Sequence, residues 1–148
     1  MSHSDLVQIA ERWLLKTRKC GAVITELVSY GVETPDAIGF RDGTSTMVEC
    51  KVSRTDFLAD AKKPFRLDPR KGMGTFRFYL CPAGIINARD LPEKWGLIWV
   101  DEKGKAQMQV GPKGNIWSVQ EQFRFDEKNH EAEQLLLVSA LRRLQARK

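Results

Sequence analysis

The sequence predicts a single α/β domain in which a mixed β-sheet is flanked by helices, and three observations lead to this fold class. First, an Asp-Gly pair at residues 42–43 lies between two apolar runs, which is the strongest short-range signal for a β-hairpin. Second, the link from Val52 to Phe76 is long enough for a crossover to a parallel strand. Third, apolar residues recur at helical spacing near both ends of the chain. Residues 1–148 are expected to form one domain, because this length suffices for one substantial core.

The first half of the chain predicts a helix followed by three strands. A Ser-x-x-Asp capping box precedes the first apolar residues, so we expect a helix over residues 4–19. Its apolar positions are Leu6, Ile9, Ala10, Trp13 and Leu14. Residues 22–30 are expected to form a strand beside the hairpin, whose own strands cover residues 37–40 and 46–52.

The second half predicts a helix, a buried strand, a second hairpin and a final helix. A Ser-x-x-Asp cap at Ser53 opens the first of these helices, and a proline ends it. Residues 76–81 form a nearly continuous apolar run, which is typical of a central strand. Residues 95–100 and 106–110 predict a hairpin at the sheet edge, with its tryptophans in the core. The last helix is predicted over residues 127–146, with these positions buried: Ala132, Leu135, Leu136, Val138 and Leu141.

Two carboxylates fall opposite each other on the predicted first hairpin. If residues 42–43 are a two-residue loop, Arg41 pairs with Thr44, and the same register places Asp36 opposite Glu49. The Cβ atoms of directly opposed residues are roughly 5 Å apart. Like charges at this distance are destabilising unless a cation compensates them. Mg²⁺, which binds carboxylate, carbonyl and water oxygens, would supply that charge.

A lysine joins these carboxylates because strand side chains alternate between the two faces of a sheet. Glu49 and Lys51 share one face, and Cys50 between them points to the opposite face. The pattern therefore predicts a metal site at Asp36 and Glu49 with Lys51 beside it. The alternative is that the same three side chains form a solvated cross-strand ion pair on an ordinary sheet.

This constellation resembles the active-site motif of the PD-(D/E)XK nuclease superfamily. The matching residues are Pro-Asp at residues 35–36, a strand, and Glu-x-Lys at residues 49–51. The resemblance covers roughly residues 5–81, and residues 51–60 are similar to a stretch of uncharacterised phage and prophage members. It implies a restriction-endonuclease-like fold, a three-layer core with a mixed central sheet flanked by helices, as in Holliday junction resolvases.

The resemblance also implies an Mg²⁺- or Mn²⁺-dependent DNA endonuclease of DNA repair, recombination or phage DNA processing. By this resemblance Asp36 and Glu49 would be metal ligands, and the backbone carbonyl of Cys50 would be a third. Lys51 would position or activate the water that attacks the phosphodiester.

Many members of the superfamily carry a further glutamate on the first helix, which here would be Glu11. This residue lies at the border of the apolar face of the predicted helix. Glu26, on the expected strand beside the hairpin, is a rival for the same role. An ordinary surface position for Glu11 is the remaining alternative.

The positive charge of the chain is concentrated just downstream of the predicted site. Between Lys51 and Arg77, eight basic residues stand against three acidic ones, so this segment carries the whole net charge of +5. A basic patch beside a metal site suits a phosphate backbone, and residues 62–74 are expected to be a mobile loop that grips DNA. The predicted nucleic-acid contacts are Ser53, Arg54, Thr55, Lys62, Lys63, Arg66, Arg70 and Lys71. A solvated basic loop without a partner is the alternative.

Several other classes of protein are disfavoured. No apolar run is long enough to cross a membrane, and the first residues lack a signal-peptide pattern, so we expect a cytoplasmic protein of a bacterium or a phage-infected host, not a secreted one. Three scattered cysteines without a CxxC pair argue against a disulfide framework or a zinc site. The two histidines are too few and too scattered for a histidine-based metal site.

Two functions from other classes compete with the endonuclease. One is a catalytically inactive nucleic-acid-binding module that keeps the nuclease fold, and the other is a small basic phage or host interaction protein. A homodimer would supply the two active sites that nicks on opposite strands usually require, but no surface in the sequence indicates one.

Overall fold

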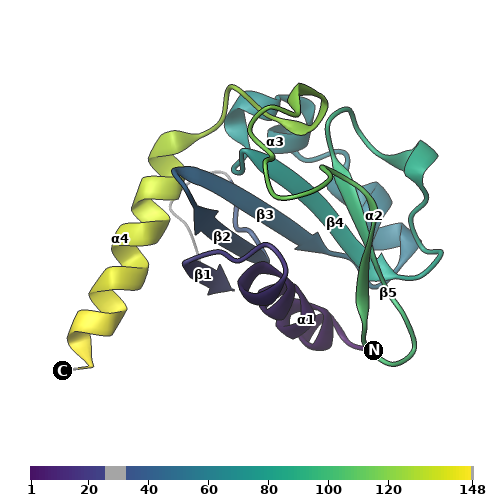
Figure 1. Cartoon of the computed structure of the whole chain (residues 1–148), viewed down its shortest axis with the longest axis horizontal. Helices are drawn as coiled ribbons and strands as arrows, with labels where there is room; N and C mark the ends of the chain where they lie inside the picture. Colours follow the sequence, from purple (N-terminus) through teal and green to yellow (C-terminus); the bar gives the residue numbers. More distant parts are fainter. Residues whose placement is uncertain (26–32, 148) are drawn as a thin grey trace.

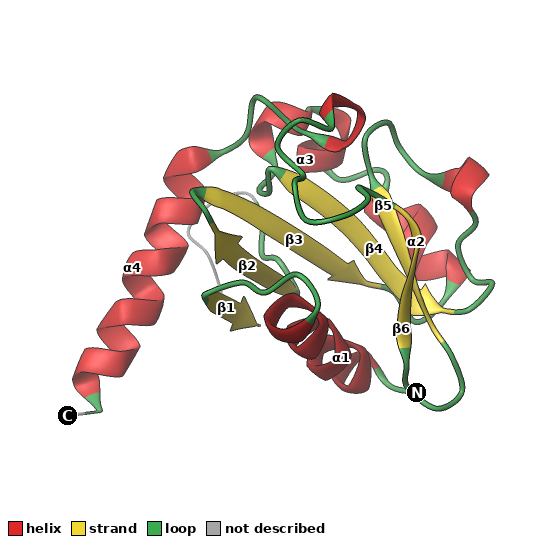
Figure 2. Ribbon diagram, in the orientation of Figure 1, coloured by secondary structure: helices red, strands yellow, loops and turns green. Residues whose placement is uncertain are grey.

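The structure, a computed structural model, describes residues 1–25 and 33–147. Its strands are β1 (Ala22–Thr25), β2 (Ala37–Arg41), β3 (Thr44–Cys50), β4 (Phe76–Pro82), β5 (Gly96–Val100) and β6 (Ala106–Val110). Its helices are α1 (His3–Lys16), α2 (Arg54–Asp60), α3 (Pro64–Leu67) and α4 (His130–Ala146), with 3-10 turns at Pro69–Lys71, Ala88–Asp90 and Glu121–Phe123. The strands form one open sheet in the order β1-β2-β3-β4-β5-β6 (Figure 2).

The sheet is mixed, with parallel strands at its centre and antiparallel strands at both edges. β3, β4 and β5 are parallel to one another, which confirms the crossover predicted between Val52 and Phe76. β1 and β2 extend the sheet on one side, and β6 closes the other side as the predicted edge hairpin with β5. The predicted α/β class, a mixed sheet flanked by helices, is confirmed.

The first helix forms where its capping box predicts. The Ser2 hydroxyl accepts a hydrogen bond from the Asp5 N–H at 3.1 Å, and the Asp5 carboxylate accepts one from the Ser2 N–H at 2.9 Å. α1 ends at Lys16, three residues before the predicted end. The chain then turns toward the sheet through Lys19, which has a left-handed φ of 62°.

A separate apolar core lies on each face of the sheet. α1 packs against the face that carries Val48 and Cys50 (Figure 1). The opposite face carries Met47 and Tyr79 and is covered by α2 and the beginning of α4. The predicted alternation of β3 is therefore confirmed, and Glu49 lies on the face opposite to α1.

The last helix differs from its prediction in which residues it buries. Ala132 and Leu136 are buried as predicted. Leu135, Val138 and Leu141 were predicted to be buried, but they are 38%, 46% and 55% exposed. The C-terminal half of α4, which carries Leu141, extends beyond the sheet and has solvent around it (Figure 1). No helix among the described residues is long and apolar enough to cross a membrane.

The segment 62–74, predicted as a mobile loop, is folded against the sheet. It contains α3 and a 3-10 turn, and its apolar residues Phe65 and Met73 are buried. Arg77 of β4 also holds it, because its guanidinium donates hydrogen bonds to the carbonyl oxygens of Gly74 at 2.9 Å and Pro69 at 3.0 Å. The segment looks like a loop in the sequence because its helices are each only about one turn long.

Candidate functional site

The β2–β3 hairpin has the predicted register. Residues 42 and 43 form the loop with left-handed φ values of 50° and 74°, which an Asp-Gly pair accommodates. Every residue pair of the ladder follows that register, and the next position brings Asp36 opposite Glu49. The two carboxylates predicted to lie together are therefore at adjoining ends of neighbouring strands.

Asp36 ties the start of β2 to two other segments. Its Oδ2 accepts a hydrogen bond from the backbone N–H of Cys50 at 2.8 Å. Its Oδ1 lies 3.2 Å from Nε2 of His3, at the first turn of α1. The sequence offered no signal for the histidine contact, because the two residues are far apart in the chain.

Glu49 and Lys51 lie side by side on the same face, as predicted. Both are buried, and 3.8 Å separates Nζ of Lys51 from Oε2 of Glu49. Burial, and then the nearby Asp36 carboxylate, raise the pKa of Glu49 well above its ordinary value. The ionised form of Glu49 is therefore costly unless cations stabilise it.

Asp36, Glu49 and Lys51 form a charged cluster, and Asp60 at the end of α2 is a further acidic residue of it. Its fully buried carboxylate lies 3.1 Å from Nζ of Lys51, and the Tyr79 hydroxyl donates a hydrogen bond to it. Although burial acts to raise it, Arg66, Tyr79 and Lys51 together hold the pKa of Asp60 below its ordinary value. A sequence signal existed, because Asp60 follows the apolar Phe57 by three positions on one helix and so shares its buried side.

Arg66 lies at the centre of the cluster, although it was predicted as a surface contact to DNA. Its side chain is 3% exposed, and its guanidinium lies 4.7 Å from the centre of the Trp95 ring. It forms three ion pairs, with Glu33 at 2.5 Å, Asp60 at 2.8 Å and Glu49 at 3.6 Å. Burial opposes its charge, but these carboxylates raise the pKa of Arg66 above its ordinary value. Arg66 is thus the internal counter-charge of the cluster.

Glu33 is the second acidic residue that sequence reasoning missed. It is buried, and its Oε1 accepts a hydrogen bond from the backbone N–H of Met73 at 2.8 Å. It therefore connects the segment before β2 to the folded segment before β4. No local pattern distinguishes it from an ordinary polar residue of a loop.

The other glutamates considered for the site have different positions. Glu11 is exposed on α1, which covers the opposite face of the sheet, so the structure does not bring it to Asp36 and Glu49. Glu26 lies outside the described residues. The acidic residues that the structure does bring to Glu49 are Asp36, Glu33 and Asp60.

The donor set at Asp36 and Glu49 is of a kind that Mg²⁺ uses. Mg²⁺ is usually held by one or two carboxylates, with water or phosphate oxygens filling the remaining positions. Within residues 1–25 and 33–147, no group of three or more His, Cys, Asp or Glu side chains is arranged to hold a metal ion. A metal ion at Glu49 would share this carboxylate with Lys51 and Arg66, whose charges compensate it only in part, since its pKa stays raised.

Several of the predicted nucleic-acid contacts have structural partners. The Ser53 hydroxyl caps α2 by accepting a hydrogen bond from the Asp56 N–H at 3.2 Å. Arg54 donates two hydrogen bonds of 2.9 Å to the carboxylate of Asp90. Lys63 lies 3.4 Å from the Asp60 carboxylate, with its side chain partly in solvent. Three of the residues are simply exposed: Thr55, Lys62 and Lys71.

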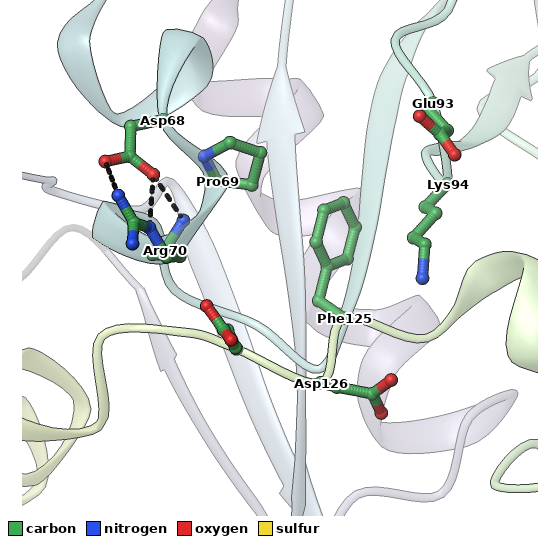
Figure 3. A pocket seen from close by; sticks show the side chains of 8 residues that line it. Asp68, Pro69, Arg70, Glu93, Lys94, Phe125 and Asp126 are labelled. Carbon is green, nitrogen blue, oxygen red and sulfur yellow. Dashed lines mark hydrogen bonds and ion pairs between the residues drawn. The ribbon is translucent and has the colours of Figure 1, made fainter.

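Arg70 lines a separate surface cavity of about 430 Å³ (Figure 3). Its Nε lies 3.1 Å from Oδ1 of Asp68, and its hydrogen bonds hold the pKa of Asp68 below its ordinary value. The charged residues around this cavity are Asp68, Arg70, Glu93, Lys94, Asp126 and Glu127. Carboxylates outnumber basic groups there, so the cavity does not suit a phosphate, and neither Asp36 nor Glu49 lines it.

Comparison with known proteins identifies a shared fold. No protein-family model and no curated protein matches the chain. A solved structure of similar fold is that of the SPO1766 protein of unknown function from Silicibacter pomeroyi, with a TM-score of 0.64 and 24% sequence identity. The similarity covers 99% of this chain and 90% of that chain. The α/β fold described above therefore also occurs in that bacterial protein.

Proposed function

We propose that this chain is an Mg²⁺-dependent DNA endonuclease with a restriction-endonuclease-like core. The observation that carries the proposal is the placement of Asp36, buried Glu49 and buried Lys51 at one end of the β2–β3 hairpin. A carboxylate whose pKa is raised by burial and by a second carboxylate is a group that a divalent cation would stabilise. The basic residues around the cluster would attract a phosphate backbone.

The side chains can be given roles in phosphodiester hydrolysis. Mg²⁺ at Asp36 and Glu49 would polarise the scissile phosphate and lower the pKa of a bound water. Lys51 is held in position by Asp60 at 3.1 Å and Glu49 at 3.8 Å, so its ammonium group can orient the attacking water and stabilise the charge that develops on the phosphate. Asp60, which also accepts the Tyr79 hydrogen bond, acts as a positioning residue for Lys51.

A cleavage assay tests this proposal. Supercoiled plasmid, single-stranded DNA and a four-way junction would each be incubated with Mg²⁺, Mn²⁺ or EDTA. Cleavage should require the metal and should fall at least about 100-fold in Asp36→Asn and Lys51→Ala. Glu102→Gln, an acid-to-amide change at an exposed position of the β5–β6 turn, is the matched control. Cleavage that persists in EDTA, or in folded Asp36→Asn at the wild-type rate, would refute the assignment.

A catalytically inactive nucleic-acid-binding module is the second candidate, and the position of Arg66 favours it. Arg66 forms ion pairs with Glu33, Asp60 and Glu49. A protein cation therefore takes part of the role that a metal ion would have in stabilising these carboxylates. Calorimetry distinguishes the two candidates. DNA binding that is the same in Mg²⁺ and EDTA, and the same in Asp36→Asn, combined with no cleavage, would support the inactive module.

A further inference from the structure

A second pair of basic side chains lies toward the other end of β3, on the face that α1 covers. Arg18, just after α1, and Arg41, the last residue of β2, line two cavities of about 250 and 280 Å³. Asn115 and Trp117 line both cavities as well, so the two adjoin. The rim residue Thr44 is five positions from Glu49, which is roughly 17 Å along a strand. The cavities are therefore separate from the carboxylate cluster.

The guanidinium of Arg18 is buried and has no direct ion-pair partner among the described residues, although the Asp42 carboxylate lies near it on the rim of one cavity. The residue is 6% exposed, and its Cζ lies 3.7 Å from the centre of the Trp117 ring. Its Nε donates a long hydrogen bond of 3.4 Å to the Thr46 hydroxyl. Among the described residues, no carboxylate forms an ion pair with Arg18, and no acceptor binds its two Nη nitrogens. A buried guanidinium with free donors beside a cavity is a site that can take an anion.

Arg41 adds a second positive charge to the same cavities. Its Nη1 donates a hydrogen bond to the backbone oxygen of Arg18 at 2.8 Å. Its Nε lies 3.2 Å from the carboxylate of Asp42, which is largely in solvent. Burial, and then the charge of Arg41, lower the pKa of Arg18. Two like charges are thus held together at an energetic cost that an anion in the cavity would offset.

We propose that these cavities bind a phosphoryl group, with Arg18 and Arg41 as its charged hydrogen-bond donors. The Trp117 ring lies 3.7 Å from Cζ of Arg18, so packing holds this guanidinium beside the cavity, where its N–H groups can bind a phosphate. The amide of Asn115 lies on the same rim. The exposed side chain of Ile116 would contact the sugar or base that carries the phosphate. A nucleic-acid strand and a free nucleotide both offer this chemistry. The inference uses none of the residues of the proposed nuclease site.

An NMR titration tests the proposal directly. ¹⁵N-labelled protein would be titrated with inorganic phosphate, and separately with acetate at the same ionic strength. The Nε–H signal of Arg18 and the indole N–H signal of Trp117 should shift saturably with phosphate. Shifts that do not saturate, or that acetate reproduces, would overturn the proposal. Asp36→Asn should bind phosphate like the wild type, so this test is independent of cleavage.

Variants and larger ligands complete the test. Arg41→Gln, at a partly exposed position, should weaken phosphate binding at least about tenfold, because it removes one charge-assisted donor. Arg18→Gln should do the same if it folds, and exposed Arg89→Gln is the control. Wild-type affinity in Arg41→Gln would contradict the proposal. Tighter binding of a short oligonucleotide than of a nucleoside monophosphate, weakening with salt, would identify a strand as the source, and equal affinity would identify the nucleotide.

A different observation supports a second inference, which concerns α4. Its exposed apolar side chains at Leu137, Val138, Leu141 and Leu144 follow the spacing of one helical side. Glu131 near the start of the helix and Arg142, eleven residues or about three turns later, lie on one flank of this stripe. α4 thus presents an apolar stripe with an acidic beginning and a basic end.

We infer that a second copy of the chain covers this stripe, with the two α4 helices antiparallel. A two-fold axis across the stripe places the acidic beginning of each helix against the basic end of the other, so the charges are complementary in this orientation. In the parallel orientation the acidic beginnings of the two helices would lie at the same end and would not meet the basic ends. The stripe also explains why α4 carries leucines beyond the edge of its own sheet (Figure 1).

Light scattering coupled to size-exclusion chromatography tests this inference. The wild type should have twice the mass of one chain, and Leu141→Glu should weaken the dimer at least about tenfold. Leu58→Glu, a similarly exposed leucine on α2, is the matched control. Arg142→Glu should weaken the dimer, and combining it with Glu131→Arg should restore it. A wild-type mass of one chain, or a Leu141→Glu dimer as stable as the wild type, would overturn the inference.

Discussion

Replacing Arg66 with methionine should destabilise the folded chain by about 3–5 kcal/mol, because it removes the central cation of a buried carboxylate cluster. Methionine keeps an unbranched apolar stem, so the packing against Trp95 is largely retained. The change therefore acts mainly on the charge. Glu33, which is buried, would lose its 2.5 Å ion pair with Arg66.

The magnitude can be worked from the distances. Arg66 makes two close ion pairs, at 2.5 Å with Glu33 and 2.8 Å with Asp60, and each charged hydrogen bond contributes about 1.5–3 kcal/mol. The third pair, with Glu49, is longer at 3.6 Å and should add little. Two close pairs thus account for about 3–6 kcal/mol, in agreement with the cost of breaking a buried pair.

Urea unfolding followed by circular dichroism measures the effect. The destabilisation should be largest near neutral pH and should shrink in acid, because protonated carboxylates no longer need the cation. Arg70→Met, at an exposed arginine paired with Asp68, is the control and should change stability by less than about 0.5 kcal/mol. An Arg66→Met protein as stable as the control variant, or equally destabilised at both pH values, would refute the reasoning.

The same variant also separates the two proposed functions. If Asp36 and Glu49 bind Mg²⁺, the metal should stabilise Arg66→Met by about 2.7 kcal/mol at a hundred times its dissociation constant. Asp36→Asn combined with Arg66→Met should lose that response. No stabilisation by Mg²⁺ in Arg66→Met would favour the inactive module.

Three further predictions concern the buried residues around the sheet. The pKa of Glu49 is raised above 4.5, so its ionisation makes stability fall as the pH rises from that value toward the folded-state pKa, and Glu49→Gln should remove this fall in urea unfolding. Gly39→Ala should lower the urea midpoint, because the new Cβ would lie 2.5 Å from Sγ of Cys20, and Cys20→Ala should relieve part of the loss by removing that sulfur. Burial raises the pKa of Cys81 to about 11, so its thiol should react with a disulfide reagent only as the protein unfolds, and rapid reaction of the native protein would contradict this.

The hairpin and its charged residues were predictable because the relevant signals are local. The Asp-Gly loop sets the register of β2 and β3, and the alternation of a strand then places Glu49 and Lys51 on one face. The caps at Ser2 and Ser53 were predictable for the same reason, since each involves a residue three positions away. These predictions required no knowledge of which helix covers which face.

The composition of the cluster was not predictable in the same way. Arg66 belongs to a run of basic residues that look equivalent in the sequence, and Glu33 lies in a segment without any periodic pattern. Their pairing joins residues 33 positions apart, and it exists because the segment before β4 folds back over the sheet. The prediction that Leu135, Val138 and Leu141 of α4 are buried was wrong, because helical periodicity shows which side of a helix is apolar but not how far the sheet beneath the helix extends.

The amino-acid sequence was thus sufficient for the order of the strands, the parallel crossover and the register that brings Asp36 to Glu49, since spacing along the chain governs all three. Tertiary structure alone decided which charged side chains are buried together. It placed Arg66 inside the molecule and not on the basic surface, and it buried Arg18 without a direct ion-pair partner among the described residues. The physical reason is that burial and electrostatic compensation depend on contacts between distant segments, which no local pattern records.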